Sequence, residues 1–219
     1  MSDLMSVLMM VFLFVSITYM VKITIEKNRI QTIAVTYENL QNELYLDLKK
    51  EFGKDLEIWN AELDESTLSI RFENPEILFE VGSAELKNNF KTLLNDFFPR
   101  YLNILTSDKY RNDIEEIRIE GHTSSEWYNK TSEQQAYFNN MELSQNRTRK
   151  VLEYILQQNW NKNLFEWEKK HLTANGLSSS KIIIDANGQE DKEKSRRVEF
   201  RVKTDAEKRI VRILKQDKT

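Results

Sequence analysis

The sequence predicts an α+β protein made of a single N-terminal transmembrane helix, a helical connector and an α/β sandwich domain. Residues 4–21 carry no charge, no Gly or Pro interrupts the chain before Gly53, and strand-like and helix-like patterns alternate after it. We place the transmembrane helix at residues 1–22, the connector at 23–56, the domain at 57–204 and a basic C-terminal helix or tail at 205–219.

The composition narrows the class of function. The chain has 219 residues, with 32 Lys+Arg against 35 Asp+Glu and a formal net charge of −3. A dedicated nucleic-acid binder normally has a basic face and a high pI, so we expect no nucleic acid among the partners. The chain has no cysteine, which excludes thiol catalysis, thiolate metal sites and disulfides.

Residues 4–21 (LMSVLMMVFLFVSITYMV) are interpreted as a membrane helix. As a helix they span roughly 27 Å, close to a hydrocarbon core of roughly 30 Å. A signal peptide would show a basic start and a small-residue cleavage site, and a buried soluble helix would show a polar face. Lys22, Lys27 and Arg29 follow the segment. By itself, the positive-inside rule would therefore place the C-terminal part in the cytoplasm.

Asp3 stands just before the apolar segment and has two interpretations. It can be a solvated residue that favours the start of a helix. Alternatively, it is a carboxylate at the membrane edge that a partner's helices desolvate. Desolvation would let it take up and release a proton near neutral pH.

The connector is predicted to be helical up to Phe52, because Gly53 is a helix stop signal. Its apolar residues follow an a/d heptad pattern at Ile30, Ile33, Tyr37, Leu40 and Leu44, with Leu48 one place off. One interpretation is an amphipathic helix packed on its own domain. The interpretation that we favour is a short parallel coiled coil between two copies.

The domain is predicted to be a sandwich of strands and helices. The strand-like segments are residues 57–63, 67–72, 114–120, 171–176 and 198–202, and the helix-like segments are 84–104, 143–157 and 205–216. Ser144 lies where the second helix is predicted to begin. The backbone N–H groups in the first turn of that helix would be free to bind an anion. Arg147 follows one turn later, as a carboxylate-binding guanidinium or as an ordinary surface arginine.

His122 is interpreted as a hydrogen-bonded structural residue. A metal site would need partner ligands at suitable spacing, and His171 is the only other histidine in the sequence. Ser124 and Ser125 stand near His122, but no nucleophile elbow accompanies them. We therefore expect no enzyme activity, no cofactor and no metal.

Four blocks of the chain resemble, in order and spacing, the OmpA-like peptidoglycan-binding domain. They are residues 77–86 (ILFEVGSAEL), 119–123 (IEGHT), 140–147 (NMELSQNR) and 195–200 (SRRVEF). The first block is similar to the family's strand that leads into its first helix, and the second to its Gly-His-Thr-Asp loop. Together the blocks cover roughly residues 67–203, the size of a small domain.

The OmpA-like resemblance implies the site residues. It implies that Arg147 holds a diaminopimelate carboxylate of the wall's stem peptide, in a site formed by His122, Thr123, Ser124, Asn140, Leu143 and Arg147. One position departs from the family, because Ser124 stands where the family has an aspartate. Glu126 or Glu133, in the longer stretch that follows, could replace the lost carboxylate.

Residues 3–13 (DLMSVLMMVFL) resemble the opening of MotB-like stator subunits, including the ZorB family of Zorya antiphage systems. In these families an Asp before an apolar, Met-rich helix carries the ion, which implies Asp3 as the proton-binding residue. The resemblance further implies a homodimer with a multi-span MotA- or ZorA-like partner. It also implies a single pass through the inner membrane, with the C-terminal domain in the periplasm and bound to peptidoglycan.

From both resemblances we expect the B-type subunit of a proton-driven stator. The compact length and the absence of a cytoplasmic extension favour a role in antiphage defence over the flagellar motor. The alternatives are a flagellar stator subunit, a passive tether between membrane and cell wall, and an adaptor whose domain faces the cytoplasm.

Overall fold

The computed structural model describes residues 2–73, 75–80, 82–128, 131–158 and 160–205. It divides the chain into two compact units, one of Met1–Leu40 with Ala206–Thr219 and one of Gln41–Asp205. The predicted C-terminal helix, residues 205–216, lies outside the described residues beyond Asp205.

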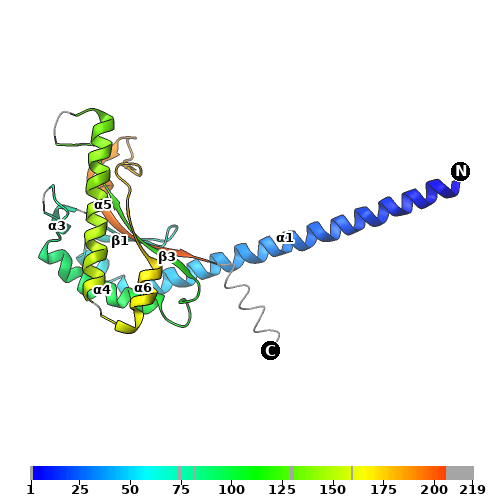
Figure 1. The fold of residues 1–219 in the computed structure, drawn as a ribbon, viewed down its shortest axis with the longest axis horizontal. Coiled ribbons are helices and arrows are strands. Elements are labelled where there is room, and N and C mark those ends of the chain that lie inside the picture. Colours follow the sequence, from blue (N-terminus) through cyan, green and yellow to red (C-terminus); the bar gives the residue numbers. More distant parts are fainter. Residues whose placement is uncertain (1, 74, 81, 129–130, 159, 206–219) are drawn as a thin grey trace. The chain divides into compact units, whose positions relative to one another are not determined.

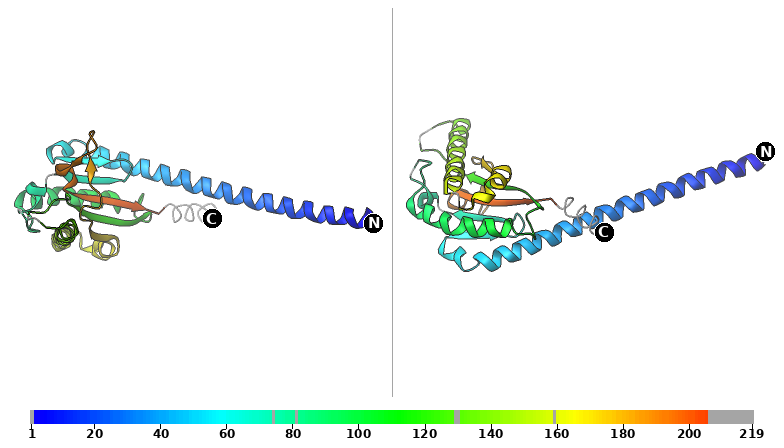
Figure 2. Two further views of the ribbon diagram at one scale, coloured as in Figure 1. Left: turned by 90° about the horizontal axis from the view of Figure 1, so that it is seen from above. Right: turned by 60° about the horizontal axis from the view of Figure 1, so that its bottom comes forward.

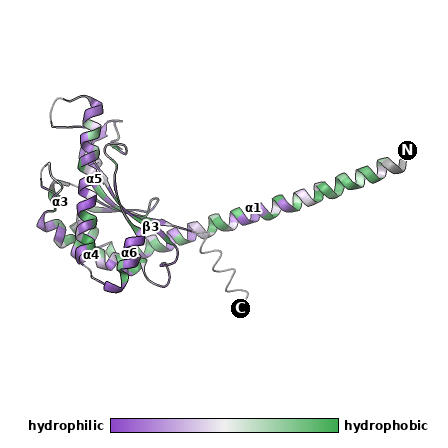
Figure 3. Ribbon diagram, in the orientation of Figure 1, coloured by the Kyte–Doolittle hydropathy of each residue, from purple (hydrophilic) through white to green (hydrophobic). Residues whose placement is uncertain are grey.

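Helix α1 (Ser2–Phe52) contains the apolar N-terminal segment, which is green in Figure 3. The helix is long and apolar enough to cross a membrane. Large apolar side chains on all sides of it, from Met5 to Ile25, are exposed. A helix that is apolar all round is suited to a lipid environment. Asp3 lies in α1, but its side chain is outside the described side chains, so its proton-binding role stays a prediction.

The last turns of α1 belong to the second unit and pack into it. Leu44, Leu48 and Phe52 are fully buried at helical spacing, and the Phe52 ring centroid lies 5.3 Å from that of Phe97. The predicted connector of residues 23–56 is therefore not uniform along its length. Its last turns pack on the domain of the same chain, as the interpretation of an amphipathic helix predicts. Within the first unit, Ile30 is exposed. The helix ends at Phe52, and the Gly53 N–H donates to the Lys49 carbonyl at 2.9 Å.

The second unit is built on a five-stranded sheet in the order β1-β2-β7-β3-β4 (Figure 1). Its strands are β1 (Ala61–Asp64), β2 (Ser69–Glu73), β3 (Ile114–His122), β4 (Leu172–Gly176) and β7 (Arg197–Thr204). Neighbours are antiparallel except β3 and β4, which are parallel and are joined by a crossover through α5 (Glu133–Gln158). A parallel pair requires such a crossover.

Shorter elements complete the second unit. They are the helices α2 (Asp55–Ile58), α3 (Pro75–Leu78), α6 (Phe165–His171) and α7 (Lys192–Ser195), a 3-10 turn (Lys162–Leu164), and the hairpin strands β5 (Ile183–Ile184) and β6 (Glu190–Asp191).

The two long helices of the domain cover the same, apolar face of the sheet. Helix α4 (Asn88–Leu105) places the Phe97 ring 5.2 Å from Phe72 and 5.1 Å from Phe200. Helix α5 crosses this face at Gly121, where an added Cβ would lie 2.7 Å from the Thr148 methyl group. Glycine is therefore required for the close approach of α5. Figure 2 shows α4 beside the end of α1.

Helix α5 begins earlier than predicted. It was expected over residues 143–157 but starts at Glu133, because the Ser132 hydroxyl accepts the Gln135 N–H at 3.2 Å. A serine three residues before a glutamine is a capping-box signal. Ser144 therefore lies inside the helix, and the predicted anion site at its backbone N–H groups is wrong.

Two other predicted segments also differ. The helix expected from residue 84 begins at Asn88, because Leu86 instead pairs with Phe79 in an isolated β-bridge. Residues 77–86 are thus not a regular strand but the end of α3 followed by this bridged turn. The strand expected over residues 57–63 is divided into α2 and β1.

Candidate functional site

A cavity of about 190 Å³ opens beside the middle of α5, and we call it the α5 pocket. Its walls come from the turn at residues 80–83, the loop after β3, α5 itself and the residue before β7. It is lined by Glu80, Gly82, Thr123, Ser124, Glu126, Trp127, Tyr128, Asn140, Leu143, Arg147 and Arg196. Of the six residues predicted to bind the wall, all but His122 line this pocket.

Asn140 fixes the loop that follows β3. Its buried amide Nδ2 donates to the Ser124 carbonyl at 3.1 Å and to the Glu126 carbonyl at 3.0 Å. On the other side of the loop, the Ser125 N–H donates to a Glu190 carboxylate oxygen at 2.9 Å. The loop is therefore held in place from two directions, which preorganises the pocket wall.

Arg147 connects α5 to the opposite wall of the pocket. Its Nε donates to the Ser83 carbonyl at 3.0 Å, and its guanidinium carbon lies 4.9 Å from the Phe79 ring centroid. A guanidinium has five N–H donors, so this contact uses one of them to position the group. The structure thus places Arg147 at the pocket as a residue that also holds the turn at residues 80–83.

Ser144, predicted as a helix cap, is instead a buried link between α5 and the segment after β4. Its hydroxyl donates to the Met141 carbonyl at 2.9 Å and accepts the Ser178 N–H at 3.1 Å. A hydroxyl that both donates and accepts is satisfied in the core. Ser144 does not line the pocket.

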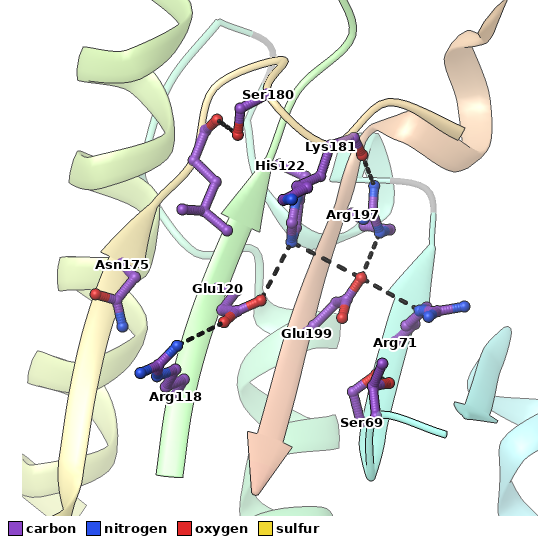
Figure 4. Close-up of polar contacts among 12 residues, drawn as sticks. Ser69, Arg71, Arg118, Glu120, His122, Asn175, Ser180, Lys181, Arg197 and Glu199 are labelled. Carbon is purple, nitrogen blue, oxygen red and sulfur yellow. Dashed lines mark hydrogen bonds and ion pairs between the residues drawn. The ribbon is translucent and has the colours of Figure 1, made fainter. Parts of the chain in front are cut away.

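His122 lies on the other face of the sheet, in a cluster of charged side chains (Figure 4). Its Nε2 is 3.7 Å from an oxygen of Glu120 and 3.7 Å from an oxygen of Glu199. Side chains alternate along a strand, so His122 shares a face with Glu120 and not with the pocket. His122 is therefore not brought together with the other five predicted residues, and its part in wall binding stays a prediction.

Glu199 is the centre of this charged cluster. Its Oε1 accepts hydrogen bonds from Nε of Arg197 at 2.6 Å and Nε of Arg71 at 3.2 Å. Burial raises the pKa of Glu199, but the charges of Arg197, His122 and Arg71 and the Arg197 hydrogen bond outweigh burial and hold the pKa below its ordinary value.

The same cluster holds the group of described residues whose atoms could ligate a metal ion. Glu120, His122 and Glu199 offer ligand atoms that all lie within 4.8 Å of one another. Two guanidinium groups already contact Glu199, and their positive charges oppose a dication there. The arrangement is better explained as a buried ion-pair network.

Sequence reasoning missed several residues that line the α5 pocket. Arg196 belongs to the SRRVEF block, and Glu80 to the first block, both of which were used only to predict the fold. Trp127 and Tyr128 lie in the longer stretch after Ser124, and their ring centroids are 5.4 Å apart.

The two acidic residues proposed to replace the lost aspartate lie in different places. Glu126 lines the pocket and forms an ion pair with Lys192, whereas Glu133 is the first residue of α5 and does not line it.

Comparisons with known proteins agree with this architecture. The OmpA family model matches residues 78–199. The Zorya protein ZorB of Escherichia coli strain Crooks is 50% identical over 216 residues, which cover 99% of this chain and 91% of that protein. A MotB-like protein from Desulfovibrio vulgaris has a similar structure, with a TM-score of 0.52 and 22% identity over 75% of this chain and 91% of the other.

These matches confirm the α+β fold class and both family resemblances. The likeness to the Desulfovibrio protein shows the fold of the domain, and the identity to ZorB extends over the whole chain. The chain therefore belongs to the family of the Zorya protein ZorB and carries an OmpA-family domain.

Proposed function

We propose that the protein is the B-type subunit of a proton-driven stator complex that acts in antiphage defence. The observation that carries the proposal is the extent of the match to ZorB, which covers 99% of the chain. At this coverage the match extends over the membrane-compatible helix as well as the OmpA-family domain. If this chain shared only a wall-binding domain with ZorB, the match would be confined to the residues of that domain.

The α5 pocket is the proposed wall-binding site. It combines two guanidinium groups, Arg147 and Arg196, with the aromatic walls of Trp127 and Tyr128. Ligand sites commonly join apolar walls to a few fixed polar groups. Guanidinium groups suit the free carboxylates of a stem peptide, because they hold a carboxylate with two parallel hydrogen bonds.

The membrane part is proposed to carry the ion. Helix α1 would cross the inner membrane once, with the C-terminal domain in the periplasm. Two copies would pair and sit among the helices of a multi-span partner of the MotA or ZorA type. There, a desolvated Asp3 would bind and release a proton. Wall binding would hold the complex fixed while proton flow moves the partner.

The experiment compares Asp3→Asn and Arg147→Ala in cells challenged with phage, beside Asp3→Glu and the exposed Arg149→Ala. Immunoblots of membrane fractions check that each variant is present at wild-type level. A stator requires that Asp3→Asn and Arg147→Ala both lose protection and that Arg149→Ala keeps it, while Asp3→Glu tests whether any carboxylate suffices. If Asp3→Asn protects fully while Arg147→Ala does not, the protein is a passive tether.

A further inference from the structure

Several polar groups that line the α5 pocket have no partner among the described residues, and three of them bear on what the pocket could bind. The Thr123 hydroxyl and Nε of Arg196 are buried without a hydrogen bond. Thr123 is only 4% exposed. The Glu80 carboxylate, at another wall, is exposed and has no ion pair or hydrogen bond within the described part of the chain. An unsatisfied buried donor costs about 1–3 kcal/mol, so the two buried donors on Thr123 and Arg196 call for an explanation.

Three other polar side chains of the pocket are already engaged. Asn140 holds the loop after β3, Glu126 pairs with Lys192, and Nε of Arg147 binds the Ser83 carbonyl. Among the unengaged groups are thus two buried donors, on Thr123 and Arg196, and one anion, on Glu80. Donors of this kind suit a carboxylate, and an anion suits an ammonium group.

We propose that Glu80 and Arg196 select a zwitterionic amino-acid centre, such as the free end of a diaminopimelate side chain. Arg196, with the Thr123 hydroxyl, binds the carboxylate beside Arg147, and Glu80 binds the ammonium group. The inference rests on the proposed wall-binding function and names the residues that set its specificity.

The assignment of Glu80 follows from the substitution at Ser124. A serine hydroxyl carries no charge and cannot balance an ammonium group. A carboxylate that pairs with the ammonium group must therefore come from another wall of the pocket. Glu133 does not line the pocket, and Glu126 already forms an ion pair with Lys192. Glu80 is the pocket carboxylate that remains, and the bridged turn that carries it is fixed by the Ser83 N–H bond to the Glu80 carbonyl at 3.0 Å.

The test uses the full-length chain in detergent micelles and two synthetic stem tripeptides ending in diaminopimelate. One has the free side-chain amine, and the other has that amine acetylated, which removes the ammonium charge. Affinities are measured by isothermal titration calorimetry for the wild type, Glu80→Gln, Glu126→Gln, Arg196→Met and Arg147→Ala. Glu85→Gln and Arg149→Met are matched controls outside the pocket lining. Circular dichroism verifies that each variant is folded.

The wild type should prefer the free amine by about two- to five-fold, the range of a partly exposed ion pair. Glu80→Gln should abolish this preference and leave the affinity for the acetylated peptide unchanged. Arg196→Met should weaken both peptides by about ten-fold or more, as the loss of a charged hydrogen bond predicts. Both control variants should behave as the wild type.

The possible failures are distinguishable. If Arg147→Ala abolishes binding but Glu80→Gln keeps the preference, or Glu126→Gln removes it, the assignment of Glu80 is overturned and the wall-binding function stands. If Arg196→Met binds as the wild type does, the role of Arg196 is overturned. If the folded wild type binds neither peptide, the proposed wall-binding function and this inference both fail.

Discussion

His122 and Thr123 are neighbours in the chain but belong to different sites. Thr123 lines the α5 pocket, whereas His122 faces the charged cluster on the opposite face of the sheet. The Gly-His-Thr motif was expected to be a loop, but Gly121 and His122 end strand β3 and only Thr123 lies beyond it. The motif could not show which of its side chains faces the α5 pocket, because that depends on where β3 ends and on the register of β3 with Arg197.

The buried pair of Glu199 and Arg197 makes a prediction about stability. Their side chains are both only 6% exposed. Removing one partner leaves an uncompensated buried charge, so Glu199→Gln should lower the free energy of unfolding at pH 7 by about 3 kcal/mol. Urea denaturation followed by tryptophan fluorescence measures the change. Glu115→Gln removes an exposed pair with Lys203 and should cost at most about 1 kcal/mol.

The same residue predicts how stability depends on pH. The pKa of Glu199 in the folded protein lies below its ordinary value of 4.5. A lowered pKa means that folding favours the ionised form. This contribution is therefore present above the ordinary value and is lost as the pH falls through the folded pKa. The wild type should lose stability on acidification below pH 4.5 more steeply than Glu199→Gln. Parallel pH profiles for the two proteins would contradict this role.

At the scale of elements, the two ends of α1 are suited to different surroundings, the first part to a lipid environment and the last turns to the interior of the domain. Its first part is apolar on all sides, whereas its last turns have one buried stripe that ends at Phe52. The heptad pattern in the sequence crosses this boundary without a visible break. Periodicity shows which face of a helix is apolar but not whether a second copy or the same domain covers that face.

The packing of the last turns is tested by two leucine substitutions. Leu48 is fully buried and Leu46 is 61% exposed on the same helix. Leu48→Ala should lower the free energy of unfolding by about 2–5 kcal/mol, because it removes buried methyl groups and leaves a cavity. Leu46→Ala should change it by no more than about 0.5 kcal/mol. Equal effects in urea denaturation would mean that the stripe does not pack into the domain.

Pairing of two copies through the earlier part of α1 is tested by disulfide crosslinking. The chain has no cysteine, so an introduced one gives an unambiguous crosslink. Ile30 holds a core position of the heptad, and Val35 holds an outward position; both are exposed in the single chain. Ile30→Cys should form disulfide-linked dimers in oxidised membranes, and Val35→Cys should not. Equal crosslinking at both positions, or none at either, would argue against a parallel coiled coil.

For the whole molecule, the sequence was sufficient for the fold class and for most of the pocket. The apolar run and the four OmpA-like blocks predicted the architecture, and Asn140, Leu143 and Arg147 line one cavity. It was not sufficient for Glu80 and Arg196, because each lies in a block that was interpreted only as part of the fold. The pocket brings together residues from distant segments, and sequence spacing does not show that proximity.

The start of α5 was missed for a local reason. Its first three residues, from Glu133, are polar, and the apolar residues that follow, Ala136, Tyr137 and Phe138, are consecutive and not spaced three or four apart. The signal for this start was the cap at Ser132. A cap residue predicts the start of a helix only weakly when no apolar periodicity follows it.

The central claim is that this chain binds the cell wall through the α5 pocket. The most direct measurement is co-sedimentation of the full-length protein, in detergent, with purified peptidoglycan sacculi. The wild type and Arg149→Ala should sediment with the sacculi, and Arg147→Ala should stay in the supernatant although circular dichroism shows that it is folded. A folded Arg147→Ala variant that sediments as the wild type does, or a wild type that stays in solution, would contradict the account.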